Sequence, residues 1–412
     1  MRIWIDATDP RSGLEVFGMT LLERQLRTVV ASGLKPTEVR IELAPDTSAV
    51  PSLPGQLLKQ LPLRWSRNPG TLRERLTRMV NEANREPVLA IEADSIVDAR
   101  LLQYLDARAG SCATVGGEGS ERTAVLRLEG TVPTSQTMDA RPPELAEAGI
   151  AQRTVADLPL QEVPDYIKKL RRHLPVYLFR VTDTASRDRA ERFLFWSNYK
   201  GSTDFFTKYV YPPLVWRMVR PLARWRVHPN VITLFNVFIT FAAVPLFAQG
   251  RWVSGLVLAY TMSVLDSVDG KLARLTFRSS WIGNILDHGL DIIHPPLWYF
   301  GWAWALSNGD MTAPVFHAAV WMAITYTLDR VVTGLFNRRT GRSIHGYRPL
   351  DERMRTFISR RNINLPLFTL GLIAGIPVPA FMVIVLWQVA TCAFHFTRLV
   401  QFWNGEAAEA AG

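Results

Sequence analysis

Cysteine is nearly absent from this chain of 412 residues. Only Cys112 and Cys392 occur, in different halves of the sequence. Two isolated cysteines exclude a disulfide-stabilised scaffold, and they do not have the clustered spacing of a cysteine zinc site. The first residues, MRIWIDATDPRSG, lack an apolar core of signal-peptide length, so we expect the N-terminus to stay in the cytoplasm.

Acidic residues are fewer than basic ones. The chain has 47 Lys and Arg against 37 Asp and Glu, which gives a formal net charge of +10. A basic balance suits nucleic acid, anionic lipid or a phosphorylated substrate. Because the second half also contains long uncharged runs, we expect membrane lipid and a phosphorylated substrate as partners, and no nucleic acid.

Residues 1–198 alternate between two kinds of apolar pattern. The strand-like runs are RIWIDA, VRIELA, PVLAIEA and TAVLRLEG. The runs with helical spacing are LLERQLRTVVASG, TLRERLTRMVNEAN and ARLLQYLDA. Alternation of this kind predicts a cytoplasmic α/β domain with a largely parallel sheet.

The remainder of the chain is typical of a membrane protein. Residues 199–228 mix aromatic residues with Lys and Arg, which favours a helix in the membrane interface over a solvated linker. Residues 229–404 are predicted to form an all-α domain of six transmembrane helices, followed by a tail at 405–412. The uncharged runs behind this prediction are 227–250, 253–265, 292–308, 311–328 and 362–397; the second must continue through Asp266 and Asp269, and the last supplies two helices.

Positive charge sets the expected orientation in a bacterial-type inner membrane. One loop holds the arginines Arg338, Arg339, Arg342, Arg348, Arg353, Arg355, Arg360 and Arg361. Another loop holds Lys271, Arg274 and Arg278, whereas the opposite side contributes Arg251. We therefore expect both termini and the intervening acidic stretch to face the cytoplasm.

Four aspartates stand beside these apolar runs. Asp266 and Asp269 are three residues apart and Asp287 and Asp291 are four apart, so each pair shares one face of a helix. Four bare carboxylates near lipid would repel one another and lose hydration, which calls for a cation. Oxygen ligands point to Mg²⁺, Mn²⁺ or Ca²⁺. The alternative, a run of ordinary helix-end charges, explains one aspartate better than four.

Small and basic residues are interleaved with these aspartates. Gly270, Ala273 and Gly283 allow close helix approach or leave room for a flat ligand. Lys271 and Arg274 can meet phosphate charge. Two metal ions, space for a ligand and nearby cations are the components of phosphoryl transfer.

The stretch 266–291 resembles the signature of the CDP-alcohol phosphotransferase (CDP-alcohol phosphatidyltransferase) family. That signature is D, two residues, DG, two residues, AR, eight residues, G, three residues, D, three residues, D, and each position is present. The resemblance covers about 199–404, including HPNVITL at 228–234. It implies a membrane enzyme of phospholipid biosynthesis, usually homodimeric. Such an enzyme cleaves a CDP-alcohol, releases CMP and joins the phosphoryl-alcohol to a hydroxyl acceptor.

The resemblance also implies roles for individual residues. Asp266, Asp269, Asp287 and Asp291 would bind two Mg²⁺ or Mn²⁺ ions, and Asp291 would also act as the base toward the acceptor hydroxyl. The CDP site would comprise Asp266, Asn230, Gly270, Ala273, Arg274 and Gly283.

The acceptor site is sought among the arginines at the cytoplasmic end of the fourth predicted span. The candidates are Arg330, Arg338, Arg339 and Arg342, which a phosphorylated acceptor such as inositol phosphate or glycerol phosphate would need. Alternatively, these arginines set topology and contact anionic lipid. Arg330 is the best candidate, although Asp329 could be its structural partner. His294 shares a helix face with Asp291, and we expect it to be a packed core histidine.

Residues 1–198 resemble sugar- and inositol-phosphate cytidylyltransferases, as in the bifunctional enzymes that make CDP-inositol and then di-inositol phosphate. The matching segments are GMTLLERQLRTVVASGL, PVLAIEADSIVDARLL and VTDTASRDRAERFL, with Asp94 and Asp183 as vestigial metal ligands. DATDPRSGLEVFGM replaces the glycine-rich loop that cradles the triphosphate in those enzymes. We expect an inactive nucleotidyltransferase-like domain, with an active cytidylyltransferase as the alternative.

Two questions stay open. A non-enzymatic protein, an ion-holding transporter or scaffold, would also keep four aspartates, although we find no internal repeat of the kind transporters usually show. The alcohol on CDP is diacylglycerol or a soluble polyol such as inositol. An inactive N-terminal domain slightly favours the lipid, because the chain would then lack its own source of a soluble CDP-alcohol.

Overall fold

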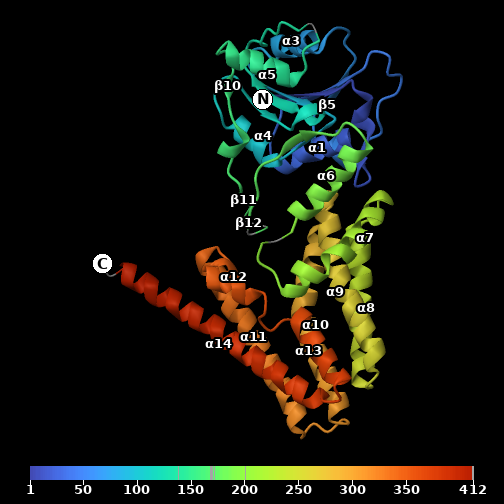
Figure 1. The fold of residues 1–412 in the computed structure, drawn as a ribbon, viewed down its shortest axis with the longest axis vertical. Helices are drawn as coiled ribbons and strands as arrows, with labels where there is room; N and C mark the ends of the chain where they lie inside the picture. The colour runs from blue at the N-terminus through green and yellow to red at the C-terminus, as the bar shows by residue number, and fades with distance from the viewer. Residues whose placement is uncertain (138, 168–169, 171, 200, 411–412) are drawn as a thin grey trace. The chain divides into compact units, whose positions relative to one another are not determined.

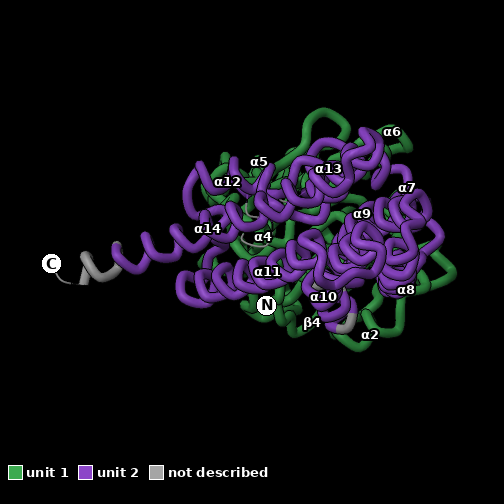
Figure 2. Tube along the Cα trace, turned by 90° about the horizontal axis from the view of Figure 1, so that it is seen from below, with its two compact units in different colours: residues 1–168, 173–197 green, residues 169–172, 198–412 purple. Residues whose placement is uncertain are grey.

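The computed structural model describes residues 1–137, 139–167, 170, 172–199 and 201–410. The chain divides into two compact units, one of residues 1–168 and 173–197, the other of residues 169–172 and 198–412 (Figure 2). The first unit is an α/β fold and the second is helical (Figure 1). This confirms the predicted combination of an α/β domain with an all-α domain.

A seven-stranded sheet forms the centre of the first unit, in the order β10-β8-β9-β6-β1-β4-β5. Its strands are β1 (Arg2–Ala7), β4 (Glu38–Leu43), β5 (Leu63–Ser66), β6 (Val88–Glu92), β8 (Cys112–Gly116), β9 (Thr123–Leu128) and β10 (Ala156–Asp157). β1 pairs in parallel with both β4 and β6, whereas β9 runs antiparallel to β6 and β8. The sheet is thus largely parallel, as the alternating pattern predicted.

Helices cover both faces of this sheet. α1 (Leu21–Ser32) and α4 (Ala99–Asp106) lie on one face, α3 (Leu72–Glu82) and α5 (Pro142–Ala151) on the other (Figure 1). Successive residues of a strand point to opposite faces. Ile3 and Ile5 of β1 therefore belong to the core under α1 and α4, and Trp4 belongs to the core under α3 and α5.

A short strand pair completes the region that follows β6. The remaining α-helices and strands of the α/β fold are α2 (Gly55–Gln60), α6 (Thr184–Ser197), β2 (Glu15–Val16), β3 (Met19–Thr20), β7 (Ser95–Val97), β11 (Tyr166–Ile167) and β13 (Leu178–Arg180). β12 (Arg172–His173) lies at the boundary between the two units along the chain. β13 pairs antiparallel with β7, so that Arg180 lies opposite Ser95. This pairing delivers Arg180 to the residues just after β6.

Eight helices make up most of the second unit. They are α7 (Pro212–Arg224), α8 (Pro229–Ala248), α9 (Trp252–Leu275), α10 (Trp281–Leu306), α11 (Pro314–Thr340), α12 (Pro349–Arg355), α13 (Arg361–Ile373) and α14 (Pro377–Ala410). α8 packs against both α9 and α10, and α11 packs against α10 and α14. The bundle core is aromatic: the rings of Trp302 and Phe368 are stacked with centroids 4.0 Å apart.

Two of the described helices, α8 and residues 377–404 of α14, are long and apolar enough to cross a membrane. The six helices predicted for 229–404 are present as α8, α9, α10, α11, α13 and α14. The number of membrane crossings stays a prediction, because α9, α10 and α11 carry charged residues and α13 has 13 residues.

Leu26 tests the packing of α1 on the sheet. Its side chain is fully buried in the core beneath α1. Leu26→Ala should reduce the free energy of unfolding of the α/β unit by about 2–5 kcal/mol, because a cavity is left in the core. Val50→Ala, at an exposed position, should change it by less than about 0.5 kcal/mol. Proteolysis of the full chain across a urea series measures both; equal losses would contradict this packing.

Candidate active site

Two of the four aspartates lie at one cavity of about 210 Å³ in the helical unit. Asp266 comes from α9 and Asp291 from α10. Arg361, the first residue of α13, bridges them: its Nη2 donates to Asp266 Oδ2 at 2.9 Å, and its Nη1 donates to Asp291 Oδ1 at 3.3 Å. The side chain of Arg361 is 10% exposed, against 22% for Asp266 and 50% for Asp291. One guanidinium thus offsets two carboxylates that still face the cavity.

Asp269 lies deeper, on the same helix as Asp266. It is buried, and its Oδ2 accepts a hydrogen bond from Thr233 Oγ1 at 2.8 Å. Asp287 belongs to α10, but its side chain lies outside the described residues. Among the side chains that the structure does describe, no group of three or more His, Cys, Asp and Glu is close enough to hold a metal ion.

A second cavity of about 130 Å³ gathers most of the predicted CDP-binding residues. Its lining includes Asn230, Gly270, Ala273, Arg274 and Gly283, together with Asp269 and Thr233. Asp266, the sixth predicted residue, lines the larger cavity instead. Gly270 and Arg274 line both, so the two cavities adjoin.

The start of α10 shows why this stretch needs glycine. Ser280 caps the helix: its Oγ accepts from the backbone N–H of Gly283 at 2.9 Å and donates to Asn230 Oδ1 at 2.8 Å. A Cβ at position 283 would lie 2.9 Å from Asn230 Oδ1 and 3.0 Å from Ser280 Oγ. Glycine therefore lets α8 and α10 approach closely beside the smaller cavity.

Basic side chains surround the larger cavity on another side. Arg330 of α11, Arg355 of α12 and Arg360 all line it. Arg330 Nη2 donates to Tyr326 Oη at 2.9 Å, and Arg360 Nη2 lies 3.4 Å from His345 Nε2. The Nε atoms of Arg330 and Arg360 are buried without a hydrogen-bond partner among the described residues. Both guanidinium groups bring positive charge to the lining of the larger cavity.

Arg330 has a different partner from the one expected, whereas His294 is packed in the core as expected. Asp329 is not the hydrogen-bond partner of Arg330: its Oδ1 lies 2.5 Å from His395 Nδ1. His294 is fully buried, with Nδ1 at 2.6 Å from the carbonyl oxygen of Leu290, as expected for a packed core histidine. Its Nε2 also lies 3.3 Å from Arg361 Nη1 and so helps to fix that guanidinium.

Three of the predicted acceptor residues do not line the cavity. Arg338, Arg339 and Arg342 are exposed, and α11 continues to Thr340. At 1.5 Å per residue, Arg338 lies roughly 12 Å beyond Arg330 along the helix axis. From the sequence, Arg355, Arg360 and Arg361 are expected only to set the membrane topology. The available signal was that Arg360 and Arg361 directly precede an uncharged run, at the same helix end as Asp266 and Asp291.

The two predicted ligands of the α/β unit have separate environments. Asp94 is 2% exposed, and its Oδ2 accepts from Arg180 Nε at 2.6 Å. Burial raises the pKa of Asp94 to about 6, and the neighbouring Glu92 adds to this rise. Asp183 is exposed, and its Oδ1 accepts from the backbone N–H of Ser186 at 2.7 Å, at the start of α6. Asp183 is thus a helix-capping residue.

Comparison with known proteins gives a family for the helical unit. Residues 226–403 match the family model described as CDP-alcohol phosphatidyltransferase. Archaetidylinositol phosphate synthase of Aeropyrum pernix is 37% identical over 78 residues, which cover 19% of this chain and 40% of that protein. The chain spans between 25% and 45% of the length of the curated relatives it matches.

Two solved structures are similar to less than half of this chain each. Phosphatidylinositol phosphate synthase of Mycobacterium tuberculosis with bound CDP-DAG is 18% identical with a TM-score of 0.37, covering 46% of this chain and 93% of its own. The 2-C-methyl-D-erythritol 4-phosphate cytidylyltransferase of Thermus thermophilus is 18% identical with a TM-score of 0.30, covering 46% of this chain and 97% of its own. The family match includes all four aspartates of the motif and the whole lining of the smaller cavity, which confirms that residues 226–403 resemble the CDP-alcohol phosphatidyltransferase family.

Proposed function

We propose that this protein is a metal-dependent membrane phosphotransferase. It transfers a phosphoryl-alcohol group from a CDP-alcohol to a hydroxyl acceptor and releases CMP, in phospholipid biosynthesis. The observation that supports this most directly is the pair of adjoining cavities. One holds Asp266 and Asp291, the other gathers five of the six residues expected to bind CDP, and Gly270 and Arg274 belong to both.

The donor atoms suit a hard cation. Asp266 and Asp291 face one cavity and keep exposed surface although Arg361 contacts both, and carboxylate oxygens are the ligands preferred by Mg²⁺ and Mn²⁺. We assign two such ions to Asp266, Asp269, Asp287 and Asp291. When bound, they neutralise the carboxylates and the diphosphate of the donor.

Asp291 is placed to take the proton of the acceptor hydroxyl. The acceptor oxygen forms a bond to the phosphorus that carries the alcohol, the bond from that phosphorus to the CMP oxygen breaks, and CMP leaves with the electron pair. Tyr326 Oη donates to the backbone carbonyl of Asp291 at 2.5 Å, which fixes the base on α10. Lys271 and Arg274 line the cavity and offset phosphate charge.

The acceptor itself carries a phosphate group in this proposal. Arg330, Arg355 and Arg360 line the cavity that holds Asp291 and bring three positive charges to it. A matched relative is named archaetidylinositol phosphate synthase, a name that includes a phosphorylated product. An inositol phosphate or a glycerol phosphate would supply both the charge and the hydroxyl. We favour a lipid alcohol on CDP.

The membrane arrangement follows the same proposal. Helices α8, α9, α10, α11, α13 and α14 cross the membrane, α7 lies in its interface, and both cavities open on the cytoplasmic side with the two termini. The arginine-rich segments between α11 and α13 support this orientation. We propose a homodimer, with residues 1–198 as the cytoplasmic domain, 199–228 as the interfacial segment and 229–404 as the membrane domain.

Asp291→Asn tests the base. Acceptor-dependent release of CMP should fall by at least about 100-fold, because the amide cannot take the proton. CMP is measured on purified protein in detergent with Mg²⁺ or Mn²⁺, with CDP-diacylglycerol and CDP-inositol offered separately to a panel of acceptors. Asp310→Asn, at an exposed position outside both cavities, is the matched control. Unchanged CMP release by Asp291→Asn would overturn the assigned role, and no CMP from any pair would favour an ion-holding protein.

Arg361→Met tests the balance of charge at the two carboxylates. Removing a cation that contacts Asp266 and Asp291 should tighten Mn²⁺ binding by roughly 3- to 10-fold, because like charge no longer opposes the metal. Bound Mn²⁺ is followed by electron paramagnetic resonance without substrate. Arg338→Met, on the exposed end of α11, should leave the affinity unchanged. Weaker Mn²⁺ binding by Arg361→Met would show that Arg361 supports the metal site instead.

Arg360→Met and Arg330→Met test the phosphate on the acceptor. Each should raise KM for a phosphorylated acceptor by roughly 10- to 100-fold, the range for losing a charged hydrogen bond, while KM for the CDP-alcohol changes little. Steady-state CMP release with both substrates varied gives the two values, with Arg338→Met as the control. If KM for the CDP-alcohol rises instead, these arginines bind the donor.

A further inference from the structure

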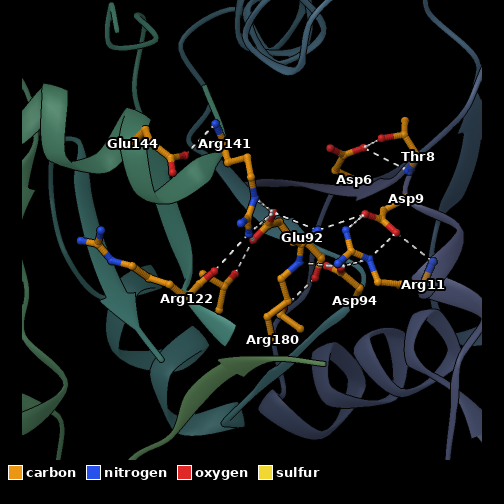
Figure 3. A network of polar contacts seen from close by, with 12 residues as sticks. Asp6, Thr8, Asp9, Arg11, Glu92, Asp94, Arg122, Arg141, Glu144 and Arg180 are labelled. Atoms are coloured by element: carbon orange, nitrogen blue, oxygen red, sulfur yellow. Dashed lines mark hydrogen bonds and ion pairs between the residues drawn. The ribbon is translucent and has the colours of Figure 1, made fainter. Parts of the chain in front are cut away.

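The α/β unit has an acidic cluster where its central strands end. Asp6 is the last residue of β1 that pairs with β6, Asp9 follows β1, Glu92 ends β6, and Asp94 comes just after it (Figure 3). In parallel α/β sheets, ligands bind outside the carboxyl ends of the strands. This edge is therefore where a nucleotide with its metal would be sought.

Arg180 supplies a cation inside this cluster. Its Nε donates to Asp94 Oδ2 at 2.6 Å, its Nη2 donates to Asp9 Oδ2 at 3.1 Å, and the same Nη2 lies 3.9 Å from Glu92 Oε1 (Figure 3). The side chains of Arg180 and Asp94 are 7% and 2% exposed. Arg11 Nε adds a second positive charge 3.8 Å from Asp94 Oδ2. A guanidinium thus occupies the position from which a metal ion would have to contact Asp94.

Asp9 supplies an anion to the loop after β1. Its Oδ1 accepts from the backbone N–H of Arg11 at 2.9 Å and from Arg11 Nε at 2.8 Å, and Arg11 Nη2 also bonds Asp9 Oδ2. These hydrogen bonds lower the pKa of Asp9 below its usual value, so the carboxylate is charged. A loop that cradles phosphate offers N–H groups and a basic side chain to the ligand. In this loop, the backbone N–H and the guanidinium of Arg11 are hydrogen-bonded to Asp9 instead.

The other two carboxylates are balanced in the same way. Glu92 accepts from Arg141 Nη2 at 3.1 Å and from Thr123 Oγ1 at 2.6 Å. Asp6 accepts from Arg75 Nη2 at 3.4 Å and from Thr8 Oγ1 at 2.8 Å. Each of the four carboxylates therefore has an arginine partner within the unit, which differs from the half-exposed Asp291 beside the membrane cavity.

We propose that this internal ion network replaces the metal and nucleotide in the α/β unit, so that the unit binds no metal–CTP complex and performs no cytidylyl transfer. The next step rests on the function proposed above. If the membrane domain consumes a CDP-alcohol, a separate cytidylyltransferase reaction must supply that CDP-alcohol. In that reaction a phosphate oxygen of the phosphorylated alcohol bonds to the α-phosphorus of CTP, the bond to the β,γ-diphosphate breaks, and pyrophosphate leaves. The network keeps the sheet edge neutral and closed.

The first test measures pyrophosphate from the full chain in detergent. Protein, Mg²⁺ and CTP are mixed with inositol phosphate, glycerol phosphate or phosphatidic acid, beside Asp94→Asn. We expect equal background release from both proteins. Pyrophosphate that the unchanged chain releases and Asp94→Asn does not would overturn the proposal. CMP release from a CDP-alcohol is measured on the same preparation, so failure of the membrane reaction is seen separately.

The second test removes the internal cation. Arg180→Met is made in a chain that also carries Asp291→Asn, which weakens the membrane metal site, and Arg187→Met on α6 is the matched control. Electron paramagnetic resonance should show additional Mn²⁺ bound by Arg180→Met and not by the control. If a folded Arg180→Met binds no more Mn²⁺ than the control, Arg180 does not occupy a cation position.

A third measurement does not depend on the folding of a variant. Hydrogen exchange of residues 88–98 in the unchanged chain is compared with and without Mn²⁺ and CTP. We expect identical exchange, because Arg180 and Arg11 already contact Asp94. Slower exchange in this segment on adding Mn²⁺ and CTP would overturn the proposal whatever the variants do.

Discussion

A carboxylate that leaves water must have a positive partner, and this constraint shapes both units of the chain. Leaving such a charge unpaired costs several kcal/mol, far more than an exposed ion pair contributes. In the helical unit, the first residue of α13 reaches across to Asp266 on α9 and Asp291 on α10. The side chain of Arg361 thereby connects the start of α13 to α9 and α10. All three residues of this connection line the larger cavity.

The same pairing has different consequences because exposure differs. Arg361 contacts one oxygen of each aspartate, and Asp291 keeps half of its side-chain surface beside a cavity of about 210 Å³. A cation can therefore replace or join the guanidinium there. Asp94 is almost fully enclosed, and two arginines approach the same oxygen. Asp94 lacks the exposed surface that Asp291 keeps, so the arrangement at Asp291 suits a working site and that at Asp94 suits a structural one.

Local spacing explains what the sequence could predict. Three- and four-residue intervals place each aspartate pair on one helix face, and strand-like and helical runs in alternation predict the sheet with helices on both faces. Neither pattern shows which residue, far away in the sequence, contacts these carboxylates in the fold. Arg361 lies 95 residues from Asp266, and Arg180 lies 86 residues from Asp94. The second contact depends on β13, a strand of three residues that is too short to show alternation. Arg338 is near Arg330 along the chain and yet does not line the cavity, so its role in binding the acceptor stays a prediction.

The two kinds of arginine at the larger cavity differ in whether the protein completes their hydrogen bonds. Arg361 reaches two carboxylates, a histidine and an amide oxygen. Arg330 and Arg360 each keep a buried Nε with no described acceptor, and a buried unsatisfied donor costs about 1–3 kcal/mol. A neutral hydroxyl would leave the two positive charges at the cavity without an anion. A phosphate group satisfies several donors and offsets the charge as well, which is why the arrangement of these arginines favours a phosphorylated acceptor over a simple alcohol.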